Sequence, residues 1–289
     1  MIISGLTGGL GNQMFQYAMG YRFAHDRKAP YRLDISRLTD ITRPYALNHL
    51  CIEALPLPEA EAKKFQPRFP RLQRKLPWLK RLIPQPIRHI YEQQWSFDSS
   101  VLELPLSAYY FEGYWQTEKY FATVADAIRR QFQLIAPMTA PRHATAGLIK
   151  DKNAVSVHVR RGDYVSNAMA NAFHGTCSPQ WYEGAMTKMA GLVEAPHFFV
   201  FSDDPGWARA NLPQQWPTDF VDPQTDRRDF EDMHLMALCR HHIIANSSYS
   251  WWGAWLNPSP DKCVMAPLQW FANAPHDTRD VTPPSWTRM

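Results

Sequence analysis

The chain has 289 residues, 45% of them hydrophobic, which is enough to bury two compact lobes. It contains no run of about 20 apolar residues, and its first residues lack the basic, apolar and cleavage regions of a secretory signal, so we expect a cytoplasmic protein without a membrane-spanning helix. The net charge is only +4, and the four scattered cysteines form no C-x-x-C pair, which argues against a disulfide framework or a zinc site.

The N-terminal half begins with the pattern of a strand, a glycine-rich turn and a helix. Residues 2–4 are apolar, glycines follow at positions 5, 8, 9 and 11, and the apolar spacing of residues 13–26 fits a helix. Residues 31–35 predict the next strand, and residues 111–132 predict a loop followed by a helix from position 122. Residues 136–147 are rich in Pro, Ala and Thr and are expected to connect two lobes.

A basic stretch broken by prolines occupies residues 63–90. It carries nine cationic side chains and no acidic one: Lys63, Lys64, Arg68, Arg71, Arg74, Lys75, Lys80, Arg81 and Arg88. A solvated helical insertion is the simplest interpretation. The alternative is a weak, peripheral contact with an anionic membrane, at the inner face, that carries a lipid-linked sugar acceptor. Nucleic acid is a poorer partner, because no nucleic-acid-binding module accompanies the charges.

The C-terminal half alternates strands with helices. Apolar strands are expected at Ala154–Val159, 197–201, 242–245 and 263–266, with a helix from Ser250. Strands that alternate with helices form parallel sheets with helices on their faces. The two halves therefore predict an α/β fold of two Rossmann-like lobes, residues 1–147 and 148–289, whose parallel sheets face a central cleft.

Polar clusters follow the predicted strands, at the edge where open parallel sheets bind ligands. One cluster, His-Val-Arg-Arg-Gly-Asp-Tyr, places Arg160 and Arg161 directly after a strand. Guanidinium groups stay charged and bind phosphate in a fork, so the pair predicts an anion site. The alternative is a structural network of salt bridges.

Three serines, Ser247, Ser248 and Ser250, follow a later strand where a helix begins. Hydroxyls and free backbone N–H groups at a helix start can bind phosphate, although the same residues are ordinary N-caps. The spacing of the tryptophans at positions 251, 252 and 255 fits core packing better than stacking on a sugar or a base.

The glycine-rich turn does not fit a dinucleotide-binding loop, because Met14 stands where G-x-G-x-x-G requires its third glycine. Asn12 and Gln13 instead bring neutral amides to the edge of the cleft. Asp203 and Asp204 follow another strand, where a carboxylate either pairs with a guanine or ribose edge or caps a helix. No Asp-x-Asp occurs, so we expect cationic side chains, and not a divalent metal, to offset the charge of a nucleotide diphosphate.

Five stretches, in order along nearly the whole chain, resemble the α-1,2-fucosyltransferase family of bacteria and animals. They are GGLGNQMFQYA from Gly8, GYWQTEKYF from Gly113, HVRRGDY from His158, FSDD from Phe201 and NSSYSWWGAWLN from Asn246. The resemblance implies a GT-B-type fold and an inverting mechanism without a metal. It also implies a C-terminal lobe that binds GDP-fucose and an N-terminal lobe that shapes the site of a galactoside acceptor. Animal members carry a membrane anchor, so the sequence is expected to be a bacterial cytoplasmic member.

The motifs and the resemblance together give the candidate site residues. They are Asn12, Arg160, Arg161 and Asp163 for catalysis; His158, Arg160, Arg161, Asp203, Ser247, Ser248 and Tyr249 for the donor; and Gln13, Trp115, Gln116 and Glu118 on the acceptor side. The base for the attacking hydroxyl stays open among Asp163, Glu118, Asp34 and His158, and a dissociative path needs no strong base. Another fucosyltransferase, of the O- or α-1,6-type, and a non-catalytic sugar- or nucleotide-binding module remain as alternatives.

Overall fold

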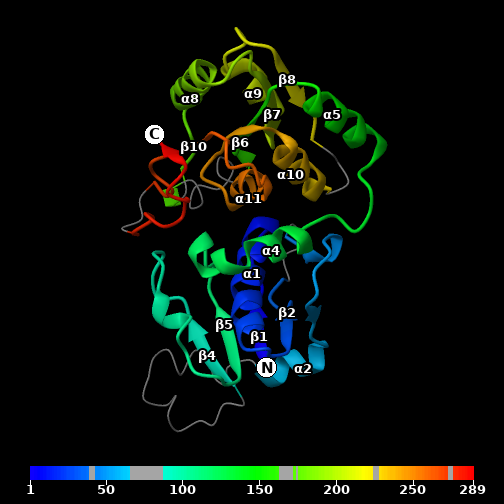
Figure 1. Ribbon diagram of the computed structural model, residues 1–289, viewed down its shortest axis with the longest axis vertical. Coiled ribbons are helices and arrows are strands. Elements are labelled where there is room, and N and C mark those ends of the chain that lie inside the picture. Colours follow the sequence, from blue (N-terminus) through cyan, green and yellow to red (C-terminus); the bar gives the residue numbers. More distant parts are fainter. Residues whose placement is uncertain (39–42, 66–86, 163–171, 174, 224–227, 273–275) are drawn as a thin grey trace. The chain divides into compact units, whose positions relative to one another are not determined.

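The chain divides into two units, Met1–Gln133 and Leu134–Met289, and each unit has its own sheet (Figure 1). The structure, a computed structural model, describes residues 1–38, 43–65, 87–162, 172–173, 175–223, 228–272 and 276–289. Within these residues every paired strand is parallel to its neighbour. The predicted α/β class with parallel sheets is therefore confirmed.

The first unit is built on a five-stranded sheet in the order β3-β2-β1-β5-β4. Its strands are β1 (Ile2–Gly5), β2 (Tyr31–Asp34), β3 (Leu55–Pro56), β4 (Arg88–Tyr91) and β5 (Tyr109–Glu112). Its helices are α1 (Leu10–Asp26), α2 (Glu59–Phe65) and α4 (Ala125–Gln131), with 3₁₀ turns at Leu47–His49, Ser99–Val101, Glu118–Tyr120 and Ala122–Val124. The central strand β1 is buried throughout, and the glycine turn joins it to α1, most of whose residues are also buried.

The second unit is built on a six-stranded sheet in the order β11-β10-β9-β6-β7-β8. Its strands are β6 (Ala154–Val159), β7 (His197–Ser202), β8 (Thr218–Val221), β9 (His241–Ile243), β10 (Val264–Ala266) and β11 (Thr287–Arg288). Its helices are α5 (Ala140–Lys150), α8 (Pro179–Leu192), α9 (Pro205–Asn211), α10 (Asp229–Leu238) and α11 (Ser248–Leu256).

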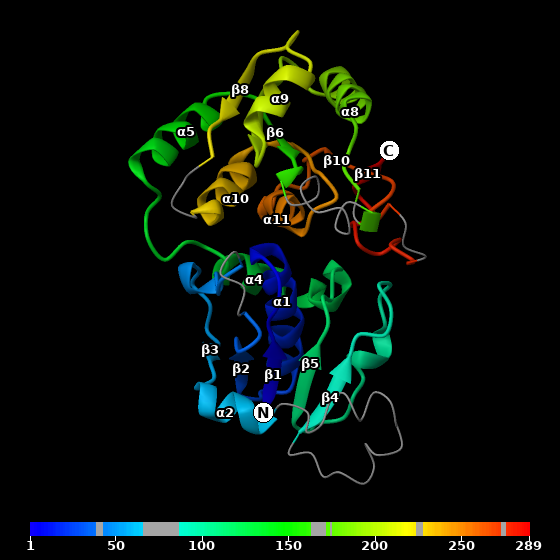
Figure 2. The same cartoon turned by 180° about the vertical axis from the view of Figure 1, so that it is seen from behind.

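Helices cover both faces of the second sheet (Figures 1 and 2). Side chains of α8 and α9, among them Tyr182, Met186 and Ala208, form one buried cluster with the valines of β6. α10 packs against both α5 and α11 on the other side. From β6 to β8 each new strand is added toward one edge of the sheet, and from β9 to β11 each new strand is added toward the other edge. Right-handed crossovers therefore place the two sets of helices on opposite faces.

The stretch of residues 136–147, predicted as a connector, is mostly helix. α5 begins at Ala140 with Pro141 in its first turn, where a missing N–H costs no hydrogen bond. The predicted boundary after residue 147 falls inside α5, and the two units divide at Gln133 because α5 packs against α10. The helix predicted from position 122 is a 3₁₀ turn followed by the shorter α4.

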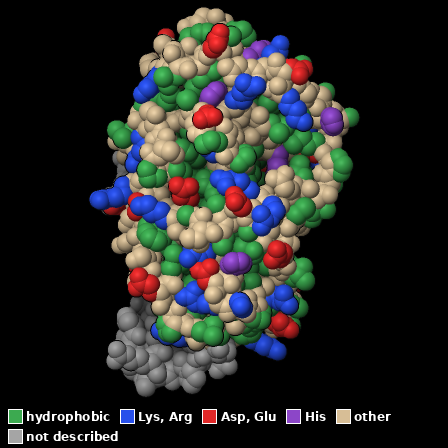
Figure 3. All heavy atoms as spheres, in the orientation of Figure 1, with side chains coloured by type: hydrophobic (Ala, Val, Ile, Leu, Met, Phe, Trp, Pro, Cys, Tyr) green, Lys and Arg blue, Asp and Glu red, His purple; other side chains and the backbone are tan. Residues whose placement is uncertain are grey.

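Most of the basic stretch, residues 66–86, lies outside the described residues. Lys63 lies on α2 and pairs with Glu59 at 2.7 Å. Arg88 opens β4, so the end of the stretch is a strand of the first sheet and not part of an insertion. In the described part of the face shown in Figure 3, basic and acidic side chains are interspersed. None of the helices described here is both long and apolar enough to cross a bilayer.

Candidate active site

Three polar segments meet at the carboxyl edge of the second sheet. β6 continues into Arg160, β7 into Asp203 and β9 into the segment that contains Asn246. β6 pairs with both β7 and β9, so the three segments are neighbours. The strand order reverses between β6 and β9. Such a switch point, outside the carboxyl ends of the strands, is where open α/β sheets bind ligands.

Asp203 fixes the loop that carries the arginine pair. Its Oδ2 lies 2.7 Å from Nη1 of Arg160, and its Oδ1 accepts a hydrogen bond from the backbone N–H of Arg161 at 2.8 Å. Gly162 approaches so closely that a Cβ at this position would lie 2.7 Å from Asp203 Oδ2. The helix-capping role considered for both aspartates belongs to Asp204, which is the N-cap of α9.

The guanidinium of Arg161 is held in a way that suits anion binding. Its Nε lies 3.3 Å from Oδ2 of Asp204, and its Cζ stands 4.1 Å from the centre of the Trp207 ring. The side chain is 19% exposed, and neither Nη1 nor Nη2 has a hydrogen-bond partner among the described residues. A salt-bridge network thus accounts for only part of this side chain. Nη1 and Nη2 are therefore available as the two-nitrogen fork with which arginine binds phosphate.

His158 lies near the end of β6 and is 5% exposed. Its ring stands 5.3 Å from the ring of Tyr249, and its backbone carbonyl accepts a hydrogen bond from Tyr182 Oη at 3.0 Å. Its Nδ1 is buried without a hydrogen-bond partner in the described part of the chain. Burial, helped by the charge of Arg160, lowers the pKa of His158 to about 3. The imidazole is therefore neutral at pH 7 and too weak a base to activate a hydroxyl.

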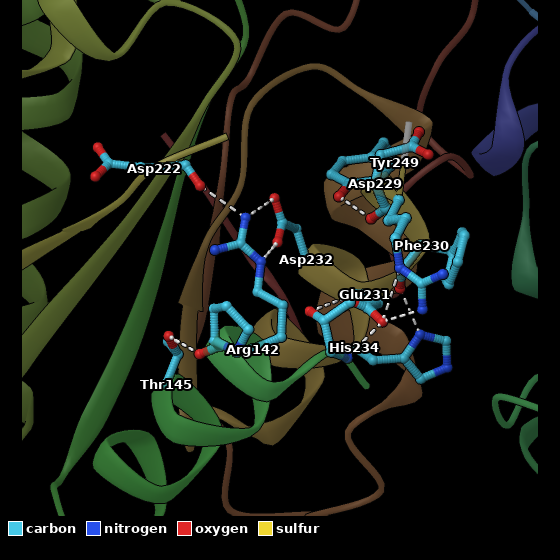
Figure 4. A network of polar contacts seen from close by, with 12 residues as sticks. Arg142, Thr145, Asp222, Asp229, Phe230, Glu231, Asp232, His234 and Tyr249 are labelled. Carbon is cyan, nitrogen blue, oxygen red and sulfur yellow. Dashed lines mark hydrogen bonds and ion pairs between the residues drawn. The ribbon is translucent and has the colours of Figure 1, made fainter. Parts of the chain in front are cut away.

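Tyr249 is tied to the first turn of α10 (Figure 4). Its Oη donates a hydrogen bond to the backbone carbonyl of Asp229 at 2.5 Å. Burial raises the pKa of this phenol well above its ordinary value, and the nearby carboxylates of Asp232 and Asp229 add to the rise. The phenol is therefore neutral, and it keeps its ring against His158.

The carboxylates of this turn are engaged by other side chains (Figure 4). Nε of Arg142 lies 2.6 Å from Oδ1 of Asp232, whose pKa burial nevertheless raises to about 6. Glu231 is 0% exposed and accepts hydrogen bonds from Thr139 N at 2.9 Å and Thr139 Oγ1 at 2.8 Å, and from Arg228 Nη2 at 2.5 Å. In the parts of the chain that the structure describes, no three His, Cys, Asp or Glu side chains are grouped to hold a metal ion.

The serines at the start of α11 act first as structural groups. Ser247 is the N-cap, and its Oγ accepts a hydrogen bond from the backbone N–H of Tyr249 at 3.4 Å. Ser248 is half-buried, and phosphate binding by either serine stays a prediction. The tryptophans at 251, 252 and 255 are at most 2% exposed, which confirms that they pack in the core.

In the first unit, the structure brings Asn12 and Gln116 together. Asn12 lies in the first turn of α1 and Gln116 in the loop after β5, the strand next to β1. Nε2 of Gln116 donates a hydrogen bond to Oδ1 of Asn12 at 2.9 Å. Gln116 is 6% exposed, and its Oε1 has no hydrogen-bond partner among the residues described. Asn12, predicted for catalysis, and Gln116, predicted on the acceptor side, thus form one amide pair.

Gln13 does not join this pair. It is 0% exposed, and its amide hydrogen-bonds to the carbonyls of Gly8 and Pro44, both at 2.9 Å, and to the backbone N–H of Ala46 at 3.0 Å. Because the amide is already engaged, Gln13 fixes the glycine-rich turn and is not placed to contact an acceptor.

Trp115 is also a structural residue. It is 1% exposed, and its ring packs edge-on against Phe111 and Tyr120, with centroid distances of 6.0 and 5.4 Å. Its backbone has a φ of 57°, a left-handed conformation. Glu92 holds it there by accepting hydrogen bonds from the backbone N–H of Tyr114 at 2.7 Å and of Trp115 at 2.9 Å. The indole is therefore not a stacking surface for a sugar.

The candidates for the catalytic base are now fewer. Asp34 is 0% exposed and accepts hydrogen bonds from Tyr110 Oη at 2.7 Å and from the backbone N–H of Ser36 at 2.9 Å, so it stabilises the fold. Glu118 is half-buried in its 3₁₀ turn. Asp163 lies outside the described residues. Glu118 and Asp163 stay predictions for the base.

Two residues that support the site were not predicted from the sequence. They are Trp207, which packs on Arg161, and Glu92, which holds the loop after β5. Asp204-Pro205 is a recognisable helix start, and it places the third residue of α9 beside the cap, but nothing local indicates that Arg161 stacks there. Glu92 bonds a loop more than 20 residues away in sequence, for which no local signal exists.

Two parallel-sheet units with an arginine pair at a strand switch point suit a glycosyltransferase, and the family match shows that class. Residues 65–289 match glycosyl transferase family 11, and the chain belongs to this family. It is 32% identical to an α-1,2-colitosyltransferase of Escherichia coli, over 100% of this chain and 99% of the relative. Human galactoside α-(1,2)-fucosyltransferase 1 matches at 27% identity over 47% of this chain and 40% of its own length. The predicted membership of the α-1,2-fucosyltransferase family is thus confirmed.

Two solved structures confirm the GT-B-type fold. Fucosyltransferase NodZ from Bradyrhizobium aligns with a TM-score of 0.50 and 15% identity, over 89% of this chain and 93% of its own. A mutant of Arabidopsis thaliana FUT1 in complex with GDP aligns with a TM-score of 0.50 and 14% identity, over 98% of this chain and 74% of its own. At these identities the likeness concerns the fold alone.

Proposed function

We propose that this protein is a galactoside α-1,2-fucosyltransferase, which transfers fucose from GDP-fucose to the 2-hydroxyl of a galactose-type acceptor with inversion and without a metal. The second unit would bind the donor, and the first unit would supply the acceptor groups. The proposed donor site rests on the guanidinium of Arg161. Asp204 fixes its Nε and the ring of Trp207 covers one face, while its terminal nitrogens have no hydrogen-bond partner in the described residues.

The arginine pair suits the chemistry of a leaving nucleotide diphosphate. As the fucosyl–oxygen bond breaks, negative charge grows on the diphosphate and positive charge on the sugar ring. A fork that is already oriented stabilises that charge without reorganising, and the loss of one such donor typically costs about 10²–10³ in rate. Asp203 supports this role, because it fixes the position of Arg160 and the backbone of Arg161.

His158 and Tyr249 support a nucleobase subsite beside the diphosphate site. The buried Nδ1 of His158 has no hydrogen-bond partner among the described residues, and such a group costs about 1–3 kcal/mol if it stays unpaired. The polar edge of a guanine would supply the missing hydrogen bond. The neutral ring of Tyr249, 5.3 Å from the imidazole, offers an aromatic neighbour.

The names of the relatives support two donor sugars. Fucose is favoured by the named galactoside α-(1,2)-fucosyltransferases. Colitose is the second candidate, because the α-1,2-colitosyltransferase of E. coli is similar over the whole chain. The two sugars differ only by the 3-hydroxyl, which colitose lacks. Competition between GDP-fucose and GDP-colitose for the same acceptor would therefore rank them.

On the acceptor side we propose Asn12 and Gln116 as the polar groups that meet sugar hydroxyls. Gln116 Oε1, buried without a partner in the described residues, would accept a hydrogen bond from a hydroxyl of the acceptor. Glu118 or Asp163 would take the proton of the attacking hydroxyl, unless the reaction is dissociative enough to need no strong base.

Calorimetry of GDP binding tests the donor site. Arg161→Ala should weaken binding at least 10-fold without unfolding the protein, and Arg161→Lys should restore little, because a point charge does not replace the planar fork. Arg209→Ala is the matched control, since Arg209 is an exposed arginine of α9 that pairs with Asp222. Equal affinity in wild type and Arg161→Ala would remove Arg161 from the donor site.

We also propose a weak, salt-sensitive contact between the basic residues 63–90 and anionic membranes. Each Lys or Arg close to an anionic leaflet contributes roughly 1 kcal/mol, and the contribution is screened by salt. Charge reversal of Arg71, Arg74 and Lys75 should lower co-sedimentation with anionic vesicles and leave transfer to a small galactoside intact. Equal sedimentation with anionic and neutral vesicles would leave the solvated-face interpretation. Loss of transfer would mean that the stretch builds the acceptor site.

A further inference from the structure

The indole of Trp207 supports one face of the Arg161 guanidinium. The Cζ of Arg161 stands 4.1 Å from the ring centroid, within the distance at which a cation is attracted by the electron-rich face of tryptophan. Among the described residues, Arg161 has two polar partners, Asp204 at its Nε and Asp203 at its backbone N–H. The ring is therefore the contact that fixes the plane of the guanidinium.

Trp207 is itself held in place from two sides. Its backbone N–H donates a hydrogen bond to Oδ1 of Asp204 at 3.1 Å, while Oδ2 of the same carboxylate faces Arg161. Its ring packs against the buried cluster of the second sheet and stands edge-on to Tyr182, with centroids 6.5 Å apart. Tyr182 in turn hydrogen-bonds the backbone carbonyl of His158. The indole is thus packed against the core, and through Tyr182 it is linked to the backbone of His158.

We infer that Trp207 is a positioning residue for donor binding, which orients the Arg161 fork toward the diphosphate before the nucleotide arrives. This inference rests on the proposed function. An unsupported arginine side chain samples many rotamers and loses that freedom on binding. The ring removes this cost in advance, because it leaves the guanidinium one plane to occupy. Trp207 acts only through Arg161.

Two substitutions separate the ring from the rest of α9. Trp207→Leu removes the aromatic face and keeps both an apolar side chain and the backbone N–H that bonds Asp204. Trp207→Phe keeps a smaller aromatic face. Trp216→Leu is the matched control, because Trp216 is also partly buried against the same cluster. Its ring lies tilted against Phe198, with centroids 5.6 Å apart, away from the arginine pair.

The experiment is a double-mutant cycle on GDP affinity, measured by calorimetry at one salt concentration. Trp207→Leu should weaken GDP binding about 5- to 20-fold, the range that a partly buried cation–π contact supports, and Trp207→Phe should recover part of it. In the Arg161→Ala background Trp207→Leu should cause no further loss. Trp216→Leu should leave the affinity within 2-fold of wild type, even where it lowers Tm as much as Trp207→Leu does.

Three other results would overturn the inference. An equal loss from Trp207→Leu with and without Arg161 would mean that the indole acts through the packing of the core. Unchanged affinity in Trp207→Leu, with wild type binding GDP, would refute the positioning role and leave the proposed function standing. If Trp207→Leu does not fold, Trp207→Phe carries the same cycle. A wild-type protein that does not bind GDP overturns both the proposed function and this inference.

Discussion

The burial of His158 predicts how the second unit responds to acid. Folding lowers the pKa of this histidine to about 3, first by burial and then by the charge of Arg160, from about 6.5 in an unfolded chain. Between these two pH values the unfolded chain binds one proton more than the folded chain. The free energy of unfolding therefore falls as the pH is lowered through this window.

The magnitude follows from the width of the window. Each pH unit below 6.5 removes up to about 1.4 kcal/mol, so acidification from pH 6.5 to 4.5 should remove roughly 2–3 kcal/mol through His158 alone. Other groups also titrate over this range, among them His242, whose pKa burial lowers well below its usual value. A comparison with His158→Gln isolates the contribution of His158 to the loss of stability, because glutamine fills similar space and does not titrate.

The assay is urea unfolding followed by circular dichroism at pH 6.5, 5.5 and 4.5. Wild type should lose about 2–3 kcal/mol more than His158→Gln across this range. His143→Gln, at an exposed position of α5, is the matched control and should lose as much as wild type. Parallel losses in wild type and His158→Gln would refute the idea that the buried imidazole near the end of β6 is neutral in the folded protein.

Three further predictions concern the loop after β6, the loop after β5 and the need for a divalent metal. Gly162→Ala should weaken GDP binding about 10-fold, because the added Cβ would lie 2.7 Å from Asp203 Oδ2 and displace that carboxylate. This is roughly the effect of losing one charged hydrogen bond. Calorimetry measures the affinity, and Gly191→Ala, where a Cβ meets open space, is the control. Unchanged affinity would mean that Asp203 does not organise the arginine pair. Glu92→Gln should destabilise the first unit by about 1–3 kcal/mol in urea unfolding, because one amide oxygen replaces two carboxylate oxygens that accept two backbone N–H groups. The exposed Glu103→Gln should have little effect, and equal losses would contradict this account of the loop. Transfer should continue in excess EDTA, and near-total loss that manganese or magnesium restores would show that a metal is needed.

The sequence pattern predicts best where burial is uniform along an element. Residues Ala154–Val159 form β6 with the predicted bounds, because every residue of the strand is buried and valines recur at every second position. The polar clusters after β6, β7 and β9 lie together at one edge because parallel strands end on the same side of a sheet. Shorter or half-exposed strands, such as β4 and β8, give no comparable signal and were not predicted.

The orientation of individual side chains is what the sequence does not supply. Gln13 lies in the first turn of α1 and Trp115 in the loop after β5, as expected, yet both side chains turn into the core, since Gln13 has three backbone partners there and Trp115 has an aromatic pocket. Asn12 and Gln116 form a pair only because β1 and β5 are neighbours in the sheet. Such contacts depend on the strand order, which no local motif encodes.

The most direct test of the central claim is the structure of the transfer product. Purified wild-type protein is incubated with GDP-fucose and a small β-galactoside, and the product linkage is determined by NMR, with Arg161→Ala as the inactive control. We predict fucose in α linkage on the 2-hydroxyl of galactose, with release of one GDP per sugar transferred. Fucose on another hydroxyl, or GDP binding without any transfer to a galactoside, would contradict the proposed function.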